Sequence, residues 1–257
     1  MSLVLASAWQ PRGELARFER LLPQLNQLYR AIVITTPPTI DAQLLQSLNQ
    51  LPNVKAVPTT EWFQGRHLAL AEALKTQPNY IHAIDFDRAL RWIETRPSEL
   101  TSIAQRSQTH CLIIGRTWQA YATHARALIE TERTSNTMAS FFLGMPMDIS
   151  AGARGFTPVA AHFILANSPP LDALGTDAEW PVLLHRGGFK LNYCEVDGLD
   201  WEIPDQFQTQ AADEQAQQSQ AEHYDSQIEH WRYRVEVAQR IVQAGIAAAR
   251  RPLQFLS

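Results

Sequence analysis

The chain has 257 residues, of which 45% are hydrophobic and 19% charged, a balance typical of a globular protein and not of a disordered one. Its net charge of −4 provides no basic field, which argues against nucleic acid or an anionic membrane as a partner but permits a small anionic ligand. No apolar run approaches the ~20 residues that a transmembrane helix needs, and the N-terminus lacks the features of a signal peptide. We therefore expect a cytoplasmic protein without a transmembrane segment.

The first third of the chain alternates between short apolar runs and amphipathic segments. Strand-like runs occupy residues 3–8, 31–35, 54–57 and 80–84, and helical spacing of apolar residues fills 15–28, 40–51 and 65–76. This alternation predicts βαβ units and a parallel sheet with right-handed crossovers. Ligands of open α/β sheets bind outside the carboxyl ends of the strands, so we expect a site at that edge.

The middle of the chain continues with further strand-like and helical runs. Residues 111–115 and 187–196 are strand-like, whereas 157–166 and 176–186 are helical. The two cysteines, Cys111 and Cys194, lie in strand-like runs. We expect buried free thiols in a reducing compartment, not a disulfide framework or a zinc site.

The composition changes near residue 205. Residues 205–222 are polar, Gln-rich and free of glycine, which indicates a linker or the start of a solvated helix. A heptad-like seam follows, with apolar residues spaced alternately by three and four: Ile228, Trp231, Val235, Ala238, Val242, Gly245 and Ala249. The seam predicts a terminal helix packed on the parent domain or, alternatively, a helix that makes a homo-oligomer. We divide the chain into a domain at 1–204 and a polar linker with a C-terminal helix at 205–257.

Two carboxylates follow the fourth strand-like run, in the stretch Asp85-Phe86-Asp87. Residues i and i+2 of a strand face the same side, so both side chains are expected to aim at one point. Two carboxylates with phosphate oxygens and water suit a hard cation, Mg²⁺ or Mn²⁺, which would neutralise a diphosphate leaving group. Alternatively, Asp87 is only the N-cap of the helix that follows.

Gly65 and Arg66 open the helix that leads into the strand before Asp85. Backbone N–H groups and a guanidinium at a helix N-terminus can bind phosphate. The alternative is a plain helix start with a solvated arginine.

Taken in order, these motifs resemble the family 2 glycosyltransferases of GT-A fold. The similar segments are GRHLALAEAL at 65–74, YIHAIDFD at 80–87, MDISAGARGF at 147–156 and TDAEWPVLLHRGGFKLNYCEV at 176–196, within roughly residues 3–200. The resemblance implies an α/β fold of GT-A type: a mostly parallel, Rossmann-like sheet flanked by helices, with a C-terminal helical extension.

The resemblance also implies a hexosyltransferase-like enzyme. It would move a sugar from a nucleotide-diphosphate sugar to an acceptor hydroxyl, with a divalent metal and with inversion. Asp85 and Asp87 would hold the metal. Ala6, Arg66, Asp85 and Arg154 would contact the nucleotide-sugar, with Arg66 on the diphosphate. Arg154 could equally pair with Asp148.

The same resemblance assigns the acceptor side to Asp177 or Glu179. An inverting transferase needs a carboxylate that takes the proton of the attacking hydroxyl, and Asp177 matches that position better. Alternatively, Asp177 only complements the helix dipole.

Three points stay open in the sequence. A third metal ligand could be His223, His230 or Glu202. Any of four tryptophans could stack on a sugar or base, although core packing is the default for each: Trp9, Trp62, Trp180 and Trp201. The whole chain could also be a catalytically silent nucleotide-sugar binding or scaffold module.

Overall fold

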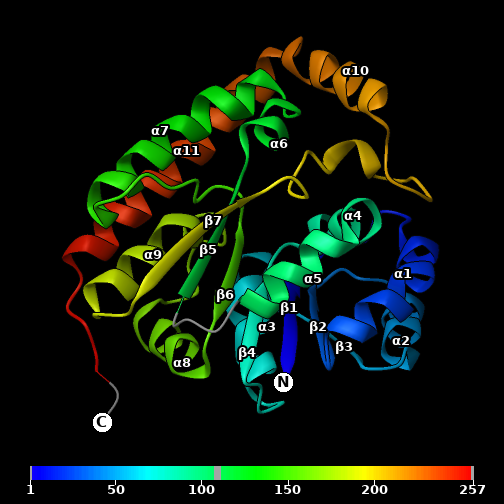
Figure 1. Cartoon of the computed structure of the whole chain (residues 1–257), viewed down its shortest axis with the longest axis horizontal. Coiled ribbons are helices and arrows are strands. Elements are labelled where there is room, and N and C mark those ends of the chain that lie inside the picture. Colours follow the sequence, from blue (N-terminus) through cyan, green and yellow to red (C-terminus); the bar gives the residue numbers. More distant parts are fainter. Residues whose placement is uncertain (1, 107–110, 256–257) are drawn as a thin grey trace.

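The structure is a computed structural model that describes residues 2–106 and 111–255, and it confirms the α/β class (Figure 1). The strands described form one mixed, mostly parallel sheet in the order β3-β2-β1-β4-β6-β5-β7. Their bounds are Leu3–Ala8 (β1), Ala31–Thr36 (β2), Val54–Pro58 (β3), Tyr80–Ala83 (β4), Cys111–Arg116 (β5), Ala153–Phe156 (β6) and Leu191–Val196 (β7).

One strand, β6, runs against its neighbours. It pairs antiparallel with both β4 and β5, whereas the pairings β1–β2, β1–β4, β2–β3 and β5–β7 are parallel. Two reversals restore the direction, so β5 and β7 point the same way as β1 to β4. The carboxyl ends of these strands therefore meet at one edge of the sheet.

The strand order reverses between β1 and β4. From β1 the chain moves outward through β2 to β3, and helix α3 (Gly65–Leu74) then returns it to β4 on the other side of β1. Such a switch point leaves a crevice at the carboxyl ends of the two central strands. Here the crevice lies between the end of β1 at Ala8 and Asp85, which follows β4.

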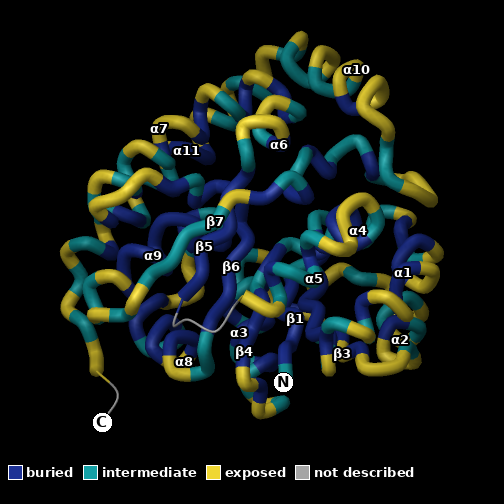
Figure 2. Tube along the Cα trace, in the orientation of Figure 1, coloured by how far each residue is buried: buried dark blue, intermediate teal, exposed yellow. Residues whose placement is uncertain are grey.

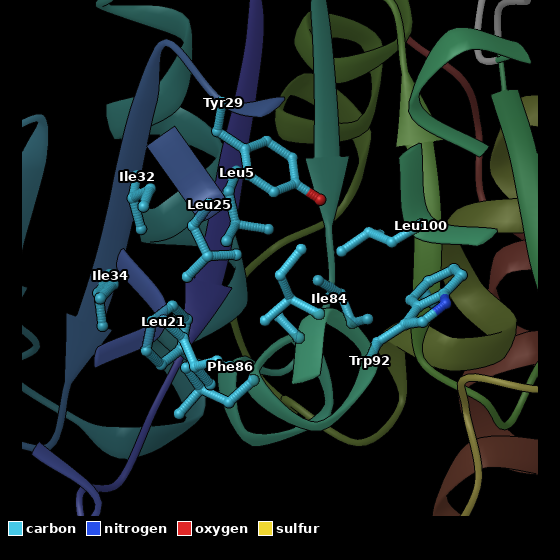
Figure 3. Packing of buried hydrophobic residues seen from close by; sticks show 14 of the residues in the cluster. Leu5, Leu21, Leu25, Tyr29, Ile32, Ile34, Ile84, Phe86, Trp92 and Leu100 are labelled. Carbon is cyan, nitrogen blue, oxygen red and sulfur yellow. The ribbon is translucent and has the colours of Figure 1, made fainter. Parts of the chain in front are cut away.

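Successive strand residues face two separate cores. On one side Leu3 and Leu5 of β1 pack with Ile32 and Ile34 of β2. The helices with residues in this core are α1 (Leu15–Leu28), α2 (Ala42–Gln50), α4 (Phe86–Thr95) and α5 (Pro97–Arg106). Figure 3 shows this layer, with side chains of α1 and α4 turned toward the strands.

The opposite face holds the second core. Val4, Val33 and Ile81 point to this side, as the two-residue period of a strand requires. It is covered by α3, α7 (Arg126–Leu143), α8 (Pro158–Asn167), α9 (Thr176–Arg186) and α11 (Ile228–Arg250). Figure 2 shows the buried strands between helices whose outer surfaces are exposed.

The shorter elements lie at the strand ends and near the C-terminus. They are η1 (Trp62–Gln64), α6 (Trp118–Ala122), η2 (Ile203–Asp205) and α10 (Glu214–Asp225). Both cysteines are free, Cys111 buried and Cys194 partly buried. In the ranges that the structure describes, no helix has both the length and the apolarity to span a bilayer.

The C-terminal helix α11 packs on α7 and α9. Ala238 and Gly245 of the predicted seam are buried, but Val235 is 56% exposed and Ile241, outside the seam, is buried. The buried face is therefore a stripe shared by two neighbouring helices instead of a two-helix seam. Gly245 permits the close approach, since a Cβ there would lie 2.7 Å from Met138 Cε. The division of the chain at residue 205 stays a prediction.

This packing predicts unequal effects of two truncations on α11. We expect Ile241→Ala to lower the free energy of unfolding by about 2–5 kcal/mol, because it leaves a cavity between α11 and its neighbours. The matched change Val235→Ala, at an exposed position, should stay within about 0.5 kcal/mol. Urea unfolding of both variants measures the difference. Comparable losses would show that Val235 is covered, as a self-association helix requires.

Candidate functional site

A cleft with a cavity volume of ≈ 190 Å³ opens at the switch point between β1 and β4. Its walls include residues at the ends of three strands: Ala8 and Trp9 at the end of β1, Thr35 and Thr36 at the end of β2, and Thr59 after β3. Asp85 and Asp87 also line it, as does Trp62, which is 54% exposed. The predicted carboxylate pair thus lies in a cleft at the ligand edge of the sheet.

The turn that carries the two carboxylates differs from the prediction. β4 ends at Ala83, Asp85 occupies the N-cap position of α4, and Asp87 lies in the first turn of that helix. A strand-to-helix turn therefore brings them together, not the pleat of a strand. The N-cap alternative for Asp87 is wrong, and the Asp85 side chain makes no capping hydrogen bond either.

Phe86, between the two aspartates, fixes this turn to the core. Its side chain is fully buried, and its ring lies 4.8 Å from that of Trp9 and 4.7 Å from that of Phe18. Such aromatic pairs contribute about 0.5–1.5 kcal/mol beyond the buried area. The apolar residue thus anchors the turn while the polar residues on either side face the cleft.

Arg66, at the start of α3, binds two of the predicted acidic residues. Its Nε and Nη2 donate to the two oxygens of Asp85 at 3.2 and 2.8 Å, and Nη1 donates to Asp177 Oδ1 at 2.7 Å. Nη1 also reaches Thr176 Oγ1 at 3.0 Å. Burial opposes ionisation of Asp85, but Arg66 and Arg88 outweigh it and lower the pKa of Asp85. Arg66 is a paired arginine and not a solvated one.

Arg154, on β6, holds Asp177 from the other side. Its Nη2 donates to Asp177 Oδ1 at 3.1 Å and to the Asp177 carbonyl at 3.0 Å. The alternative pairing of Arg154 with Asp148 is wrong, because Arg116 binds Asp148 instead. Ala6 lies behind this cluster and lines a void of only ≈ 10 Å³ with both arginines, not the open cleft.

Gly152 allows the chain to pass close over the same group of side chains. It adopts φ +67°, and a Cβ at this position would lie 3.4 Å from Arg66 Nη2 and 3.5 Å from Asp85 Oδ2. A side chain here would be strained by the backbone conformation, and its Cβ would contact the ion pair.

Glu202, one of the three candidates for a third metal ligand, lies near Asp87. It follows β7, and its Oε1 accepts from Arg88 Nε at 3.1 Å, whereas its buried Oε2 has no partner among the described residues. Burial, together with the charges of Glu202 and Asp85, raises the pKa of Asp87 to about 7. Asp87 therefore faces an excess of negative charge, in contrast to Asp85.

Glu179 does not join this group. Two residues along a helix turn a side chain by about 200°, so Glu179 and Asp177 leave α9 on different sides. Glu179 accepts from Ser168 Oγ and from Arg251 Nη1, each at 2.6 Å. It ties α9 to the chain after α11 in a buried network that also includes His67.

The remaining candidates divide clearly. Trp9, Trp180 and Trp201 are buried, so Trp62 is the candidate whose ring is exposed at the cleft. His223 contacts Gln227, and His230 stacks on Tyr224 at 3.8 Å; neither lines the cleft.

In residues 2–106 and 111–255, no group of three or more His, Cys, Asp or Glu side chains is arranged to hold a metal. A cation bound by Asp85 and Asp87 would take its other ligands from phosphate and water.

The raised pKa of Asp87 predicts a pH-dependent stability. The folded state retains the Asp87 proton to about pH 7, whereas an ordinary aspartate loses it near 3.8, so this group's contribution to stability falls as the pH rises through that window. We expect Asp87→Asn to melt above wild type at pH 8, with the difference shrinking toward pH 4. Melting temperatures from pH 4 to 8 measure it, with Glu19→Gln, an exposed position, as control. A difference that does not change with pH would contradict the assignment.

Two comparisons with known proteins found no relative of this chain. No family model matches the chain, and a search of the curated proteins finds no match. Any functional conclusion therefore depends on the cleft at the switch point, on its two carboxylates and on the arginines that surround them.

Proposed function

We propose that the chain is a glycosyltransferase of GT-A type. It would transfer a sugar from a nucleoside-diphosphate sugar to an acceptor hydroxyl, with inversion and with Mg²⁺ or Mn²⁺. One observation carries the proposal: Asp85 and Asp87 lie together after β4, beside a cleft formed at the strand-order reversal by the ends of β1, β2 and β3. The motif order described above agrees with this function.

The donor set fits a divalent cation. Carboxylate oxygens are the ligands that Mg²⁺ and Mn²⁺ prefer. Asp87 is held next to Glu202 and Asp85, and Glu202 Oε2 is buried without a partner among the described residues. A positive charge beside Asp87 would offset this local excess of negative charge. When bound, the cation supplies charge that stabilises the departing diphosphate.

The nucleoside would bind in the cleft beside the carboxylates. Two polar atoms of cleft-lining residues, Trp9 Nε1 and Thr36 Oγ1, are buried and have no hydrogen-bond partner in the described part of the chain. Such orphaned groups are rare in folded proteins and call for an explanation. A nucleobase or ribose in the cleft would provide partners, and the exposed ring of Trp62 offers a surface on which a base can stack.

The arginines and Asp177 would organise the reacting groups. Arg66 fixes Asp85 through two hydrogen bonds and links it to Asp177, so the metal side and the acceptor side of the site share one guanidinium. Asp177 would accept the proton of the attacking hydroxyl. The donors of Arg66 are already hydrogen-bonded to these carboxylates. Its proposed role is therefore to position Asp85 and Asp177 more than to contact the diphosphate directly.

A second candidate is the silent nucleotide-sugar binding module. One observation favours it: Asp177 is 6% exposed, and its Oδ1 receives hydrogen bonds from both Arg66 and Arg154. Burial and the two arginines restrict the approach of an acceptor hydroxyl to this carboxylate. Binding without turnover would follow if an acceptor cannot reach it.

The proposal predicts metal-dependent stabilisation by nucleoside diphosphates. At about 100 times its Kd a ligand adds about 2.7 kcal/mol to the native state, which raises the melting temperature of a chain of this size by about 5–10 °C. We expect such a shift with UDP or GDP in the presence of Mn²⁺. Asp87→Asn should abolish the metal-dependent part, whereas Glu19→Gln should retain it. If no nucleotide shifts the melting temperature, the nucleotide site is wrong.

Release of nucleoside diphosphate from UDP- and GDP-sugars separates the two candidates. We expect turnover in wild type and a loss of about 10²–10⁴-fold in Asp177→Asn, the range for removal of a general base. The same variant should keep the nucleotide-dependent shift. Binding by wild type without release of diphosphate would favour the silent module.

A further inference from the structure

A second, larger cavity lies at the same edge of the sheet. Its volume is ≈ 520 Å³, within the range of about 300–1,000 Å³ for small-molecule sites. It opens over the ends of β5 and β7, at Arg116 and Glu195, and is closed by α6 and α7. Figure 1 shows both helices beside these strand ends. The predicted site residues do not line this cavity.

The polar groups at the inner side of the cavity are paired with one another. Arg116 Nε and Nη2 donate to the two oxygens of Asp148 at 2.7 and 2.9 Å, and Nη2 also donates to Glu132 at 2.7 Å. Asn136 Nδ2 donates to Asp148 Oδ1 at 2.9 Å. The Arg116 guanidinium lies 4.2 Å from the centre of the Tyr121 ring. These groups bind one another and hold the shape of the site.

Other lining groups remain available to a ligand. Trp118, the first residue of α6, is 65% exposed, although its indole borders the cavity. Thr137 makes no side-chain hydrogen bond within the described residues, and Glu195 accepts one, from Tyr193. Arg133, also exposed, forms an ion pair with Glu130 at 3.7 Å. The lining thus offers an aromatic face beside hydroxyl, carboxylate and guanidinium groups.

The charges of the lining are balanced. Arg116 and Arg133 face Asp148 and Glu195, two positive against two negative. A phosphorylated ligand would find no excess of positive charge here, and an amine would find no excess of negative charge. A lipid tail could not form hydrogen bonds with the charged and hydroxyl groups of the lining. A neutral ligand with many hydroxyls and an apolar ring face satisfies both the aromatic and the polar groups.

We propose that this cavity binds a neutral saccharide, with a sugar ring against Trp118 and its hydroxyls on Thr137 and Glu195. Under the proposed function, on which this part rests, the saccharide supplies the acceptor hydroxyl. The segment 147–152 connects the two sites: Asp148 lines this cavity, and Gly152 lies over Arg66 and Asp85. The Ser150 and Ala151 carbonyls accept hydrogen bonds from Arg88, the neighbour of Asp87.

Saccharide binding can be measured without nucleotide or metal. We would titrate the full chain with neutral mono- and disaccharides (glucose, galactose, mannose, maltose, cellobiose and lactose) by ligand-observed NMR. We expect at least one to bind, and Trp118→Ala to weaken it about tenfold, or 1.4 kcal/mol, through loss of the aromatic face. Thr137→Val, which keeps the shape of the side chain, should also weaken binding. Phe141→Ala, 82% exposed on α7 and outside the cavity, should not.

The outcomes separate this inference from the proposed function. If no saccharide binds, or if Trp118→Ala and Thr137→Val both leave binding unchanged, the saccharide site is overturned. Trp118→Ala should keep the shift in melting temperature caused by nucleoside diphosphate and Mn²⁺. Saccharide binding without a shift in melting temperature by nucleoside diphosphate would support the saccharide site and contradict the proposed transferase. A shift in melting temperature without saccharide binding would support the nucleotide site and contradict the saccharide site.

Discussion

The candidate site depends on one partly buried guanidinium. Arg66 joins Asp85, which follows the central strand β4, to Asp177 on α9, 111 residues after Arg66. An ion pair that is mostly shielded from water adds little net stability, but removal of one partner leaves the other charge uncompensated. The pairings are therefore better understood as specifying geometry: Asp85 reaches the cleft and Asp177 lies near it because both are held by Arg66.

Arg66 also makes the pKa values of the two neighbouring carboxylates differ. Asp85 is compensated by Arg66 and Arg88, which lower its pKa, whereas Asp87 meets Glu202 and Asp85 in a buried setting that raises its pKa to about 7. Pairs of acids pushed apart in this way are found where a protein binds cations or moves protons. Arg88 cannot relieve Asp87 fully, since its Nε is engaged by Glu202.

Local pattern was sufficient for most of the sheet and for the centre of the site. The β-branched and apolar runs predicted β1 to β5 and β7 within a few residues, and the end of β4 indicated Asp85 and Asp87. The pattern missed β6, whose four residues include Arg154 and Gly155 and have little strand propensity. This strand is specified by its neighbours: a Cβ at residue 155 would lie 2.1 Å from Tyr80 Oη on β4.

The contacts within the site could not be predicted from local pattern. Glu202 was a candidate ligand, but its contact with Arg88, across 114 residues, is one that no local periodicity encodes. The resemblance assigned Glu179 to the acceptor side together with Asp177, although helical geometry turns the two side chains to different sides of α9. On α11 the heptad spacing predicted a single seam. Because the helix contacts both α7 and α9, its buried face also includes Ile241, which lies outside that seam.

The reversed strand explains how one segment comes to connect the two proposed sites. Because β6 is antiparallel, its amino end at Ala153 lies at the edge where β4 and β5 have their carboxyl ends. The segment that enters β6, residues 147–152, therefore runs from the cavity at Arg116 to the Arg66–Asp85 ion pair beside the cleft. The proposed transfer would use this arrangement, since its two reacting groups must be held in a fixed position relative to one another.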